Sequence, residues 1–240
     1  MSEAQKALET VRKALRSEPR VRLDSNPIHL ALESGDLVME GEVADIAAKK
    51  LALERAAAVS IGSRLVDRLR VRPATRMADG QIRDLVRDAL IDDRAFADCS
   101  VRTWIKDRLV VEHLPQASVG TIDVKVEDGV VTLDGDVPGL VQKRLAGVLA
   151  WWVPGSRDVV NGLGVTPPEE DNDEAVTDAV RIALEKDPFV NAEQIRVVVR
   201  RSVVTLMGVV PTETEREMAE FDAWYVFGVD KVINRIVVQR

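Results

Sequence analysis

Hydrophobic and polar positions follow the same order three times along the chain. Each copy opens with apolar residues spaced three and four apart, which predicts an amphipathic helix. Two β-rich runs around a tight turn, a second helix and a last β-rich strand then follow. The pattern predicts an α+β fold of three tandem α-β-β-α-β units. The expected hairpins and closing strands are 28–33 with 37–41, then 65–71; 122–126 with 130–135, then 159–165; and 195–199 with 203–208, then 232–238.

The clearest mark of the repeat is a glycine near the end of the second strand, at Gly41, Gly135 and Gly208. We expect a side chain at this position to collide with the helix that crosses the sheet. The turns at 34–36 and 127–129 contain glycine, which favours a tight hairpin. The turn at 200–202 reads Arg-Arg-Ser, so the third hairpin is less strongly indicated.

These marks divide the chain into domains 1–73, 78–167 and 171–240, and the middle domain is the longest. The interval from the first helix to the strand-end glycine is 49 residues from Val86 to Gly135, against 30 from Val11 to Gly41. The difference indicates an insertion near 100–118. We expect an extended or extra helix there, ending before Pro115, with a small amphipathic basic stretch around Trp104.

Net charge changes the expected partners. The chain carries a formal charge of −7, and residues 168–240 hold 9 Lys and Arg against 15 Asp and Glu. Nucleic-acid binding depends on neutralising phosphates, so we expect no nucleic-acid partner. A repeated architecture favours a binding surface over a single catalytic pocket.

The residues that carry the repeat also carry a resemblance. The series Val203-Val204-Thr205-Leu206-Met207-Gly208 followed by Asn234, and the matching series ending at Gly135 and Asn161, resemble the BON domain, named for bacterial osmotically inducible and nodulation proteins. The first copy is more diverged, with Asp67 where the others have asparagine. The resemblance implies two helices packed on one face of a three-stranded sheet. It also implies binding to phospholipid membranes and a role in osmotic stress, while some relatives bind potassium in the cytoplasm.

Candidate contact residues are aromatic or cationic. Trp151, Trp152 and Trp224 lie at the ends of second helices, where they either contact a membrane or partner or complete a small core. Trp104 in the insertion has cationic neighbours, Arg102, Lys106 and Arg108, which make either a basic contact surface or a packing helix.

Chemistry is sparsely represented in this sequence. Two histidines and one cysteine leave few options for a general base or a thiol nucleophile, so we expect no enzyme activity, no metal site and no cofactor. The opening residues lack a leader pattern and no long apolar stretch occurs, which predicts a cytoplasmic protein, peripheral where it meets a membrane. The leading hypothesis is a stress-associated protein that binds a phospholipid membrane surface or a protein partner. The alternatives are a potassium or small-solute sensor and an oligomeric scaffold, and the sequence leaves the oligomeric state open.

Overall fold

The computed structural model describes residues 3–60 and 64–239. They fold as two compact units, Met1–Arg72 and Pro73–Arg240. Both units combine helices with small sheets, so the predicted α+β class is confirmed. The finer division into three domains stays a prediction.

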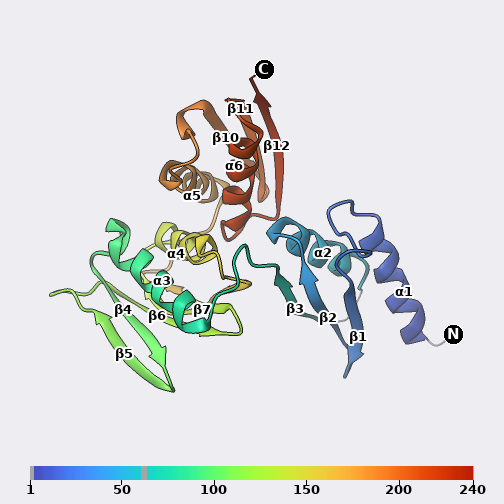
Figure 1. Cartoon of the computed structure of the whole chain (residues 1–240), viewed down its shortest axis with the longest axis horizontal. Helices are drawn as coiled ribbons and strands as arrows, with labels where there is room; N and C mark the ends of the chain where they lie inside the picture. Colours follow the sequence, from blue (N-terminus) through green and yellow to red (C-terminus); the bar gives the residue numbers. More distant parts are fainter. Residues whose placement is uncertain (1–2, 61–63, 240) are drawn as a thin grey trace. The chain divides into compact units, whose positions relative to one another are not determined.

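The first unit has the predicted α-β-β-α-β order (Figure 1). Strand β2 is central, antiparallel to β1 and parallel to β3. Both helices pack on one face of the sheet, where Val11 and Leu15 meet Leu37, Met39 and Leu69. The elements are α1 (Glu3–Arg16), β1 (Ile28–Glu33), β2 (Asp36–Val43), α2 (Ile46–Val59) and β3 (Leu65–Val71).

The second unit begins with a larger sheet. Its strand order is β5-β4-β6-β7-β8, and the short β9 also pairs with β7. Helices α3 and α4 cover one face, with Ile82, Val86 and Leu145 against Ile122 and Leu133. The elements are α3 (Asp79–Asp92), η1 (Arg94–Phe96), β4 (Cys99–Ile105), β5 (Arg108–His113), β6 (Gly120–Glu127), β7 (Val130–Val137), α4 (Leu140–Trp152), β8 (Asp158–Asn161) and β9 (Gly164–Val165).

The extra helix expected near 100–118 is wrong. The insertion forms the β4–β5 hairpin, which extends the sheet beyond β6 (Figure 1). Alternate residues of β4, Val101 and Thr103, are fully buried, which is the two-residue period of a strand. Lys106 and Asp107 both have positive φ, which gives a tight two-residue turn. The basic residues expected on a helix therefore lie on the two strands, at Arg102 and Arg108, and in the turn, at Lys106.

The second unit ends with a three-stranded sheet whose order, β10-β11-β12, repeats that of the first unit. The central β11 is antiparallel to β10 and parallel to β12. The buried residues Val180 and Ala223 come from its two helices, and Val204 and Leu206 come from the sheet. The elements are α5 (Asp173–Lys186), η2 (Ala192–Gln194), β10 (Ile195–Arg200), β11 (Val203–Val210), α6 (Glu213–Tyr225) and β12 (Lys231–Val238).

The strand-end glycines are required by the neighbouring strand and not by a helix, which corrects the expected reason. Gly41, Gly135 and Gly208 all have positive φ, between 114° and 151°. A Cβ at Gly208 would lie 2.0 Å from the carbonyl oxygen of Gln194, and one at Gly135 would lie 2.2 Å from that of Thr121. Backbone conformation and close approach therefore both demand glycine.

The third hairpin forms without a turn glycine. Arg201 and Ser202 both adopt positive φ, and the Asp173 carboxylate accepts hydrogen bonds from both backbone N–H groups, at 2.7 and 3.1 Å. These two bonds lower the pKa of Asp173. Asp79 binds the turn before β7 in the same way, through Asp128 and Gly129. A carboxylate at the start of the first helix thus stabilises a turn that glycine would otherwise favour.

Candidate interaction surfaces

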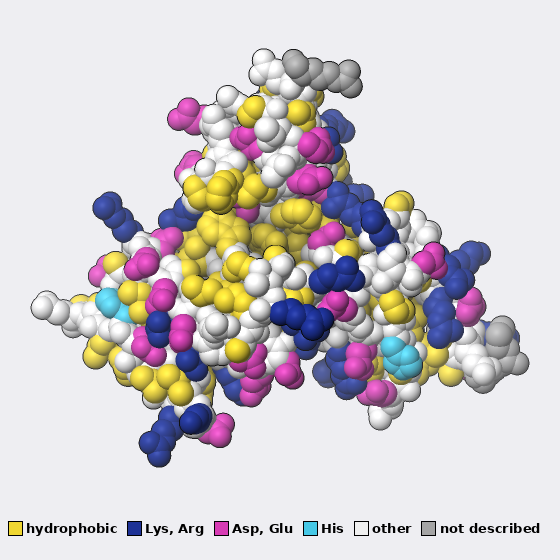
Figure 2. Space-filling view, in the orientation of Figure 1, with side chains coloured by type: hydrophobic (Ala, Val, Ile, Leu, Met, Phe, Trp, Pro, Cys, Tyr) yellow, Lys and Arg dark blue, Asp and Glu magenta, His cyan; other side chains and the backbone are white. Residues whose placement is uncertain are grey.

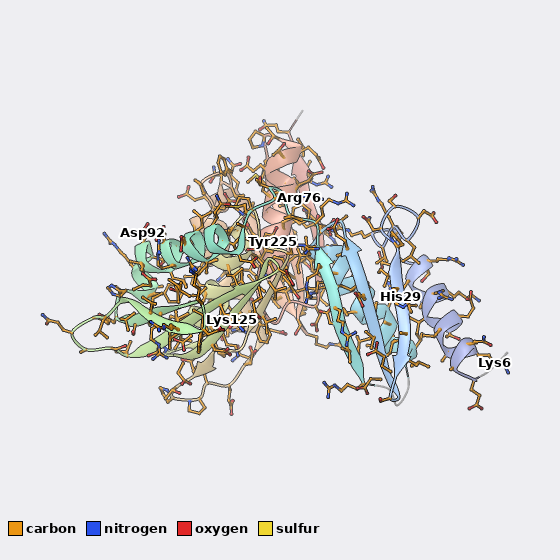
Figure 3. All side chains as sticks on the ribbon, turned by 60° about the horizontal axis from the view of Figure 1, so that its bottom comes forward. Lys6, His29, Arg76, Asp92, Lys125 and Tyr225 are labelled. Carbon is orange, nitrogen blue, oxygen red and sulfur yellow. The ribbon has the colours of Figure 1, made fainter. Side chains whose placement is uncertain are left out.

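Helices α4 and α6 meet inside the second unit, and aromatic side chains join them. Trp151 of α4 stacks on Tyr225 of α6, with ring centroids 5.6 Å apart and an interplanar angle of 18°. The Lys143 ammonium lies 5.1 Å from the ring centroid of Phe227, within cation–π range. Figure 2 shows hydrophobic side chains gathered around these helices, and Tyr225 is labelled in Figure 3. Trp151 therefore contacts another part of the same unit.

Arg144 is the most buried charge at this helix contact. Its side chain has no solvent exposure. Nε donates to the carbonyl oxygen of Phe227 at 2.9 Å, and one terminal nitrogen pairs with the Asp171 carboxylate. Among the described residues the other terminal nitrogen, Nη1, has no hydrogen-bond partner. Arg144 thus connects α4 to the segment after α6 and to the segment before α5.

Trp152 reaches the same contact through its indole N–H, which donates to Asp222 Oδ1 at 2.9 Å. Burial, with smaller contributions from the nearby Asp187 carboxyl, raises the pKa of Asp222 to about 8 against the opposing hydrogen bond from Trp152. Asp222 Oδ2 has no donor among the described residues. The Asp187 carboxylate itself accepts the Phe189 N–H at 2.8 Å.

The structure separates the three tryptophans that the sequence grouped. Trp151 and Trp152 are half-buried at the α4–α6 contact, whereas Trp224 is only 1% exposed and its indole N–H donates to Glu220. Trp224 therefore offers no surface to a partner. Sequence reasoning missed Arg144 and Asp222. The available signal was that residues 140–152 are apolar almost all round, which is typical of a helix covered on more than one side.

The β4–β5 hairpin presents the most exposed of the predicted candidates. Its helix-facing side includes Val101 and Thr103, so the alternating residues Arg102, Trp104, Leu109 and Val111 make up what we call the outer face. Trp104 is 39% exposed and Val111 is 55% exposed. Trp104 lies directly opposite Leu109. The outer face is therefore a strip of apolar side chains open to solvent.

Charges surround this strip, but they are not equally available. Arg102 makes a two-pronged pair with Asp123, at 2.6 and 2.8 Å, and Lys125 pairs with Glu127 at 2.8 Å. Lys125 is labelled on the sheet in Figure 3. Lys106 and Arg108 are exposed at the tip of the hairpin. Arg102 is therefore engaged by Asp123, whereas the exposed cations of the hairpin lie at its tip.

The predicted motif asparagines connect closing strands to second helices. Asn161 Nδ2 donates to the Lys143 carbonyl oxygen at 2.7 Å, and Asn234 Nδ2 donates to the Arg216 carbonyl oxygen at 3.0 Å. The side-chain oxygen of Asn234 also accepts the N–H of Ile236, two residues on. These asparagines are structural and do not face a ligand site.

Residues with potential for other chemistry are few. Burial, followed by the charge of Asp98, raises the pKa of the buried Cys99 thiol, which disfavours the nucleophilic thiolate. Over residues 3–60 and 64–239, no group of three or more metal-binding side chains is found. Across the same residues, no helix is long and apolar enough to span a bilayer.

Among the solved structures that match, two align along most of the chain. One is the C-terminal domain of CdsD, the structural protein of the Type III secretion system of Chlamydia trachomatis, at 13% identity, with 97% of each chain covered and a TM-score of 0.26. The other, also CdsD from Chlamydia trachomatis, is 14% identical, covers 98% of this chain and 92% of that chain, and has a TM-score of 0.25. Neither alignment supports an inference about this chain.

No curated protein matches the sequence. The model of the BON domain family does match, at residues 97–167 and again at residues 172–240. Together these segments make up more than half of the chain, and both lie in the second unit. The strand-end glycines Gly135 and Gly208 and the asparagines Asn161 and Asn234 fall within these segments. The segment 172–240 holds a complete α-β-β-α-β motif, whereas the segment 97–167 begins after α3. This chain belongs to the BON domain family.

Proposed function

We propose that this chain is a non-enzymatic binding protein that attaches peripherally to a phospholipid membrane surface. The attachment uses the outer face of the β4–β5 hairpin. The observation that carries the proposal is the exposure of Trp104 and Val111 beside Leu109 on that face. The family resemblance adds the expectation of phospholipid binding.

The chemistry of the hairpin suits the boundary between lipid chains and headgroups. Tryptophan combines a large apolar ring with an N–H donor, so it is favoured where one end is apolar and the other is wet. Lys106 and Arg108 at the exposed tip can approach lipid phosphates. Asp107 between them and the overall charge of −7 oppose attraction to anionic lipid. Apolar contact is therefore the main contribution, and salt has a modest effect.

We further propose that the first unit is a diverged BON domain, which gives domains at 1–73, 78–167 and 171–240. Support comes from the shared strand order and register. Met39 pairs with Asp67 in the first unit, as Leu133 pairs with Asn161 and Leu206 with Asn234 in the second. Asp67 thus occupies the position of the two motif asparagines.

Vesicle flotation with the full chain tests the lipid proposal. Vesicles of phosphatidylcholine, with and without phosphatidylglycerol, should carry the protein at low salt. Trp104→Ala should weaken partitioning about tenfold, because a large apolar contact is lost. The matched control is Phe189→Ala, which removes an aromatic ring that is 71% exposed but lies outside the hairpin.

Two results would overturn the lipid proposal. One is absence of flotation for the wild-type chain at low salt in both vesicle types. The other is equal flotation of Trp104→Ala, Phe189→Ala and wild type. In the first case, a protein partner for the same face becomes the better interpretation.

A further inference from the structure

Strand β5 is an open edge of the largest sheet. Within the described residues, its neighbour in the strand order is β4 alone. Val110 and Val111 in its middle are 37% and 55% exposed. An exposed edge presents backbone N–H and C=O groups that can pair with another strand.

The hairpin geometry tells which backbone groups are available. Ile105 and Arg108 flank the two-residue turn and pair with each other. In such a hairpin the flanking residues form a hydrogen-bonded pair, so their backbone groups point toward each other. Directions alternate along a strand, and the groups of Leu109 and Val111 therefore point away from β4. A partner strand would bond to these two residues.

The side chains of this edge are complementary to themselves. The run Arg108-Leu109-Val110-Val111-Glu112 begins with a cation and ends with an anion. When two copies are placed antiparallel with Val110 opposite Val110, Arg108 faces Glu112 twice and Leu109 faces Val111 twice. The Leu109–Val111 pairs are also the ones whose backbone groups point outward. Charge, apolar contact and hydrogen-bond direction therefore select the same register.

We propose that two copies of this chain associate by antiparallel pairing of β5 with β5, with Val110 on a two-fold axis. The interface is isologous, as expected for a symmetric dimer. It joins the two large sheets into one and places both outer faces, with Trp104 and Val111, on the same side of the joined sheet. This interface goes beyond the proposed membrane attachment and does not depend on it.

The existing contacts of β5 set the length of the pairing. Glu112 has contacts within its own copy. Its Oε1 accepts a hydrogen bond from Thr103 Oγ1 at 2.7 Å, and its Oε2 lies 3.9 Å from Arg87. The strand register shifts between Val101 and Arg102, opposite Glu112, and such irregularities limit pairing beyond them. The contact is short, well below the area of a standard stable interface. We expect a dissociation constant on the order of 0.1 mM.

Charge reversal tests the pairing in the full chain. Arg108→Glu places two acids opposite each other at both ends, and Glu112→Arg does the same with two cations. Each variant alone should self-associate about tenfold more weakly than wild type by sedimentation equilibrium. An equal mixture of the two variants should regain wild-type association, because each end of the mixed dimer then sets an acid of one copy opposite a cation of the other.

Cross-linking tests the register directly. In the proposed dimer, Val110→Cys places two thiols opposite each other in a pair whose backbones lie close together, which suits a disulfide. Oxidised glutathione should therefore link Val110→Cys into a dimer. Val111→Cys is the matched control, because its counterpart is Leu109, and the buried Cys99 is common to both variants.

The outcomes are decisive in either direction. A monomeric wild type up to about 1 mM, or a mixture of reversal variants that associates no better than each alone, overturns the proposal. So does equal cross-linking of Val110→Cys and Val111→Cys. Far-UV circular dichroism of each variant establishes folding, and if Glu112→Arg fails to fold, the cross-linking pair still decides. Neither measurement contains lipid, so failure here leaves the membrane proposal intact.

Discussion

Helices α2 and α6 occupy equivalent places in the first and last α-β-β-α-β motifs, yet they bury polar groups in opposite ways. On α2, the buried Lys49 reaches the closing strand and contacts Asp67 at 3.0 Å and the Leu69 carbonyl oxygen at 2.9 Å. At the corresponding place beside α6, the amide of Asn234 donates to the Arg216 carbonyl oxygen and to Glu220. The same strand-to-helix connection is thus ionic in one motif and amide-based in the other.

The difference shows that different polar groups can connect strand and helix in the same α-β-β-α-β motif. Asp67 keeps one role of the asparagine, because its Oδ1 accepts the Leu69 N–H at 2.9 Å as Asn234 accepts that of Ile236. A carboxylate cannot donate to the helix, so in the first unit the direction is reversed and Lys49 of the helix donates to the closing strand. Asp67 and Lys49 together keep the closing strand connected to α2, whereas either one alone would lose this connection. The family match covers residues 97–167 and 172–240 and omits this motif.

The largest expected effect comes from the acid that α6 buries without a cation. Asp222 has an ordinary pKa of 3.8, raised to about 8 in the fold mainly by burial. Between about pH 4 and about pH 8 the native state holds one more proton than the unfolded chain, so stability falls as pH rises. A shift of this size corresponds to about 6 kcal/mol. Asp222→Asn should remove this dependence and be more stable than wild type at pH 8.

Urea unfolding followed by tryptophan fluorescence measures this effect selectively. All four tryptophans, at positions 104, 151, 152 and 224, lie in the second unit. Asparagine can still accept from Trp152 and can donate to Asp187, so the helix contact is retained. Identical pH dependence in wild type and Asp222→Asn between pH 4 and pH 8 would refute the protonated state of Asp222.

The next largest effect is expected on α2. Lys49→Met keeps the length of the side chain but removes the cation, leaving Asp67 and the Leu69 carbonyl oxygen without this partner. Breaking a mostly buried pair costs about 3 kcal/mol. Far-UV circular dichroism should show an earlier unfolding transition, while tryptophan fluorescence, which reports the second unit, should not change. Lys13→Met, at an exposed position of α1, is the control and should leave both signals unchanged.

The sequence predicted the features that depend on neighbours in the chain. The three hairpins predicted from local alternation are present as β1–β2, β6–β7 and β10–β11, whereas the closing strand expected at 159–165 is interrupted and forms β8 and β9. The β4–β5 hairpin was missed because Arg102, Lys106 and Arg108 were interpreted as an amphipathic basic helix, while the buried alternation of Val101 and Thr103 is short. Arg144 and Asp222 were missed for a different reason. Their partners, Phe227 and Trp152, lie 83 and 70 residues away, so they depend on how the two motifs of the second unit pack.

The smallest expected effect comes from replacing Asn234 by the acid that the first unit has at Asp67, without adding the lysine that accompanies it there at position 49. Asn234→Asp loses the donor to Arg216 and brings a carboxylate close to Glu220, whose Oε2 lies 3.0 Å from Asn234 Nδ2. We expect a loss of about 2 kcal/mol. Asn161→Asp is the matched variant, because Gly147 lies near the Asn161 amide at the place that Glu220 takes near Asn234. We expect it to lower the free energy of unfolding by about 1 kcal/mol. Equal losses of unfolding free energy in the two variants, measured by tryptophan fluorescence, would mean that Glu220 does not contribute. The lost hydrogen bond to the helix carbonyl oxygen would then account for the whole effect and would by itself explain why Lys49 accompanies Asp67.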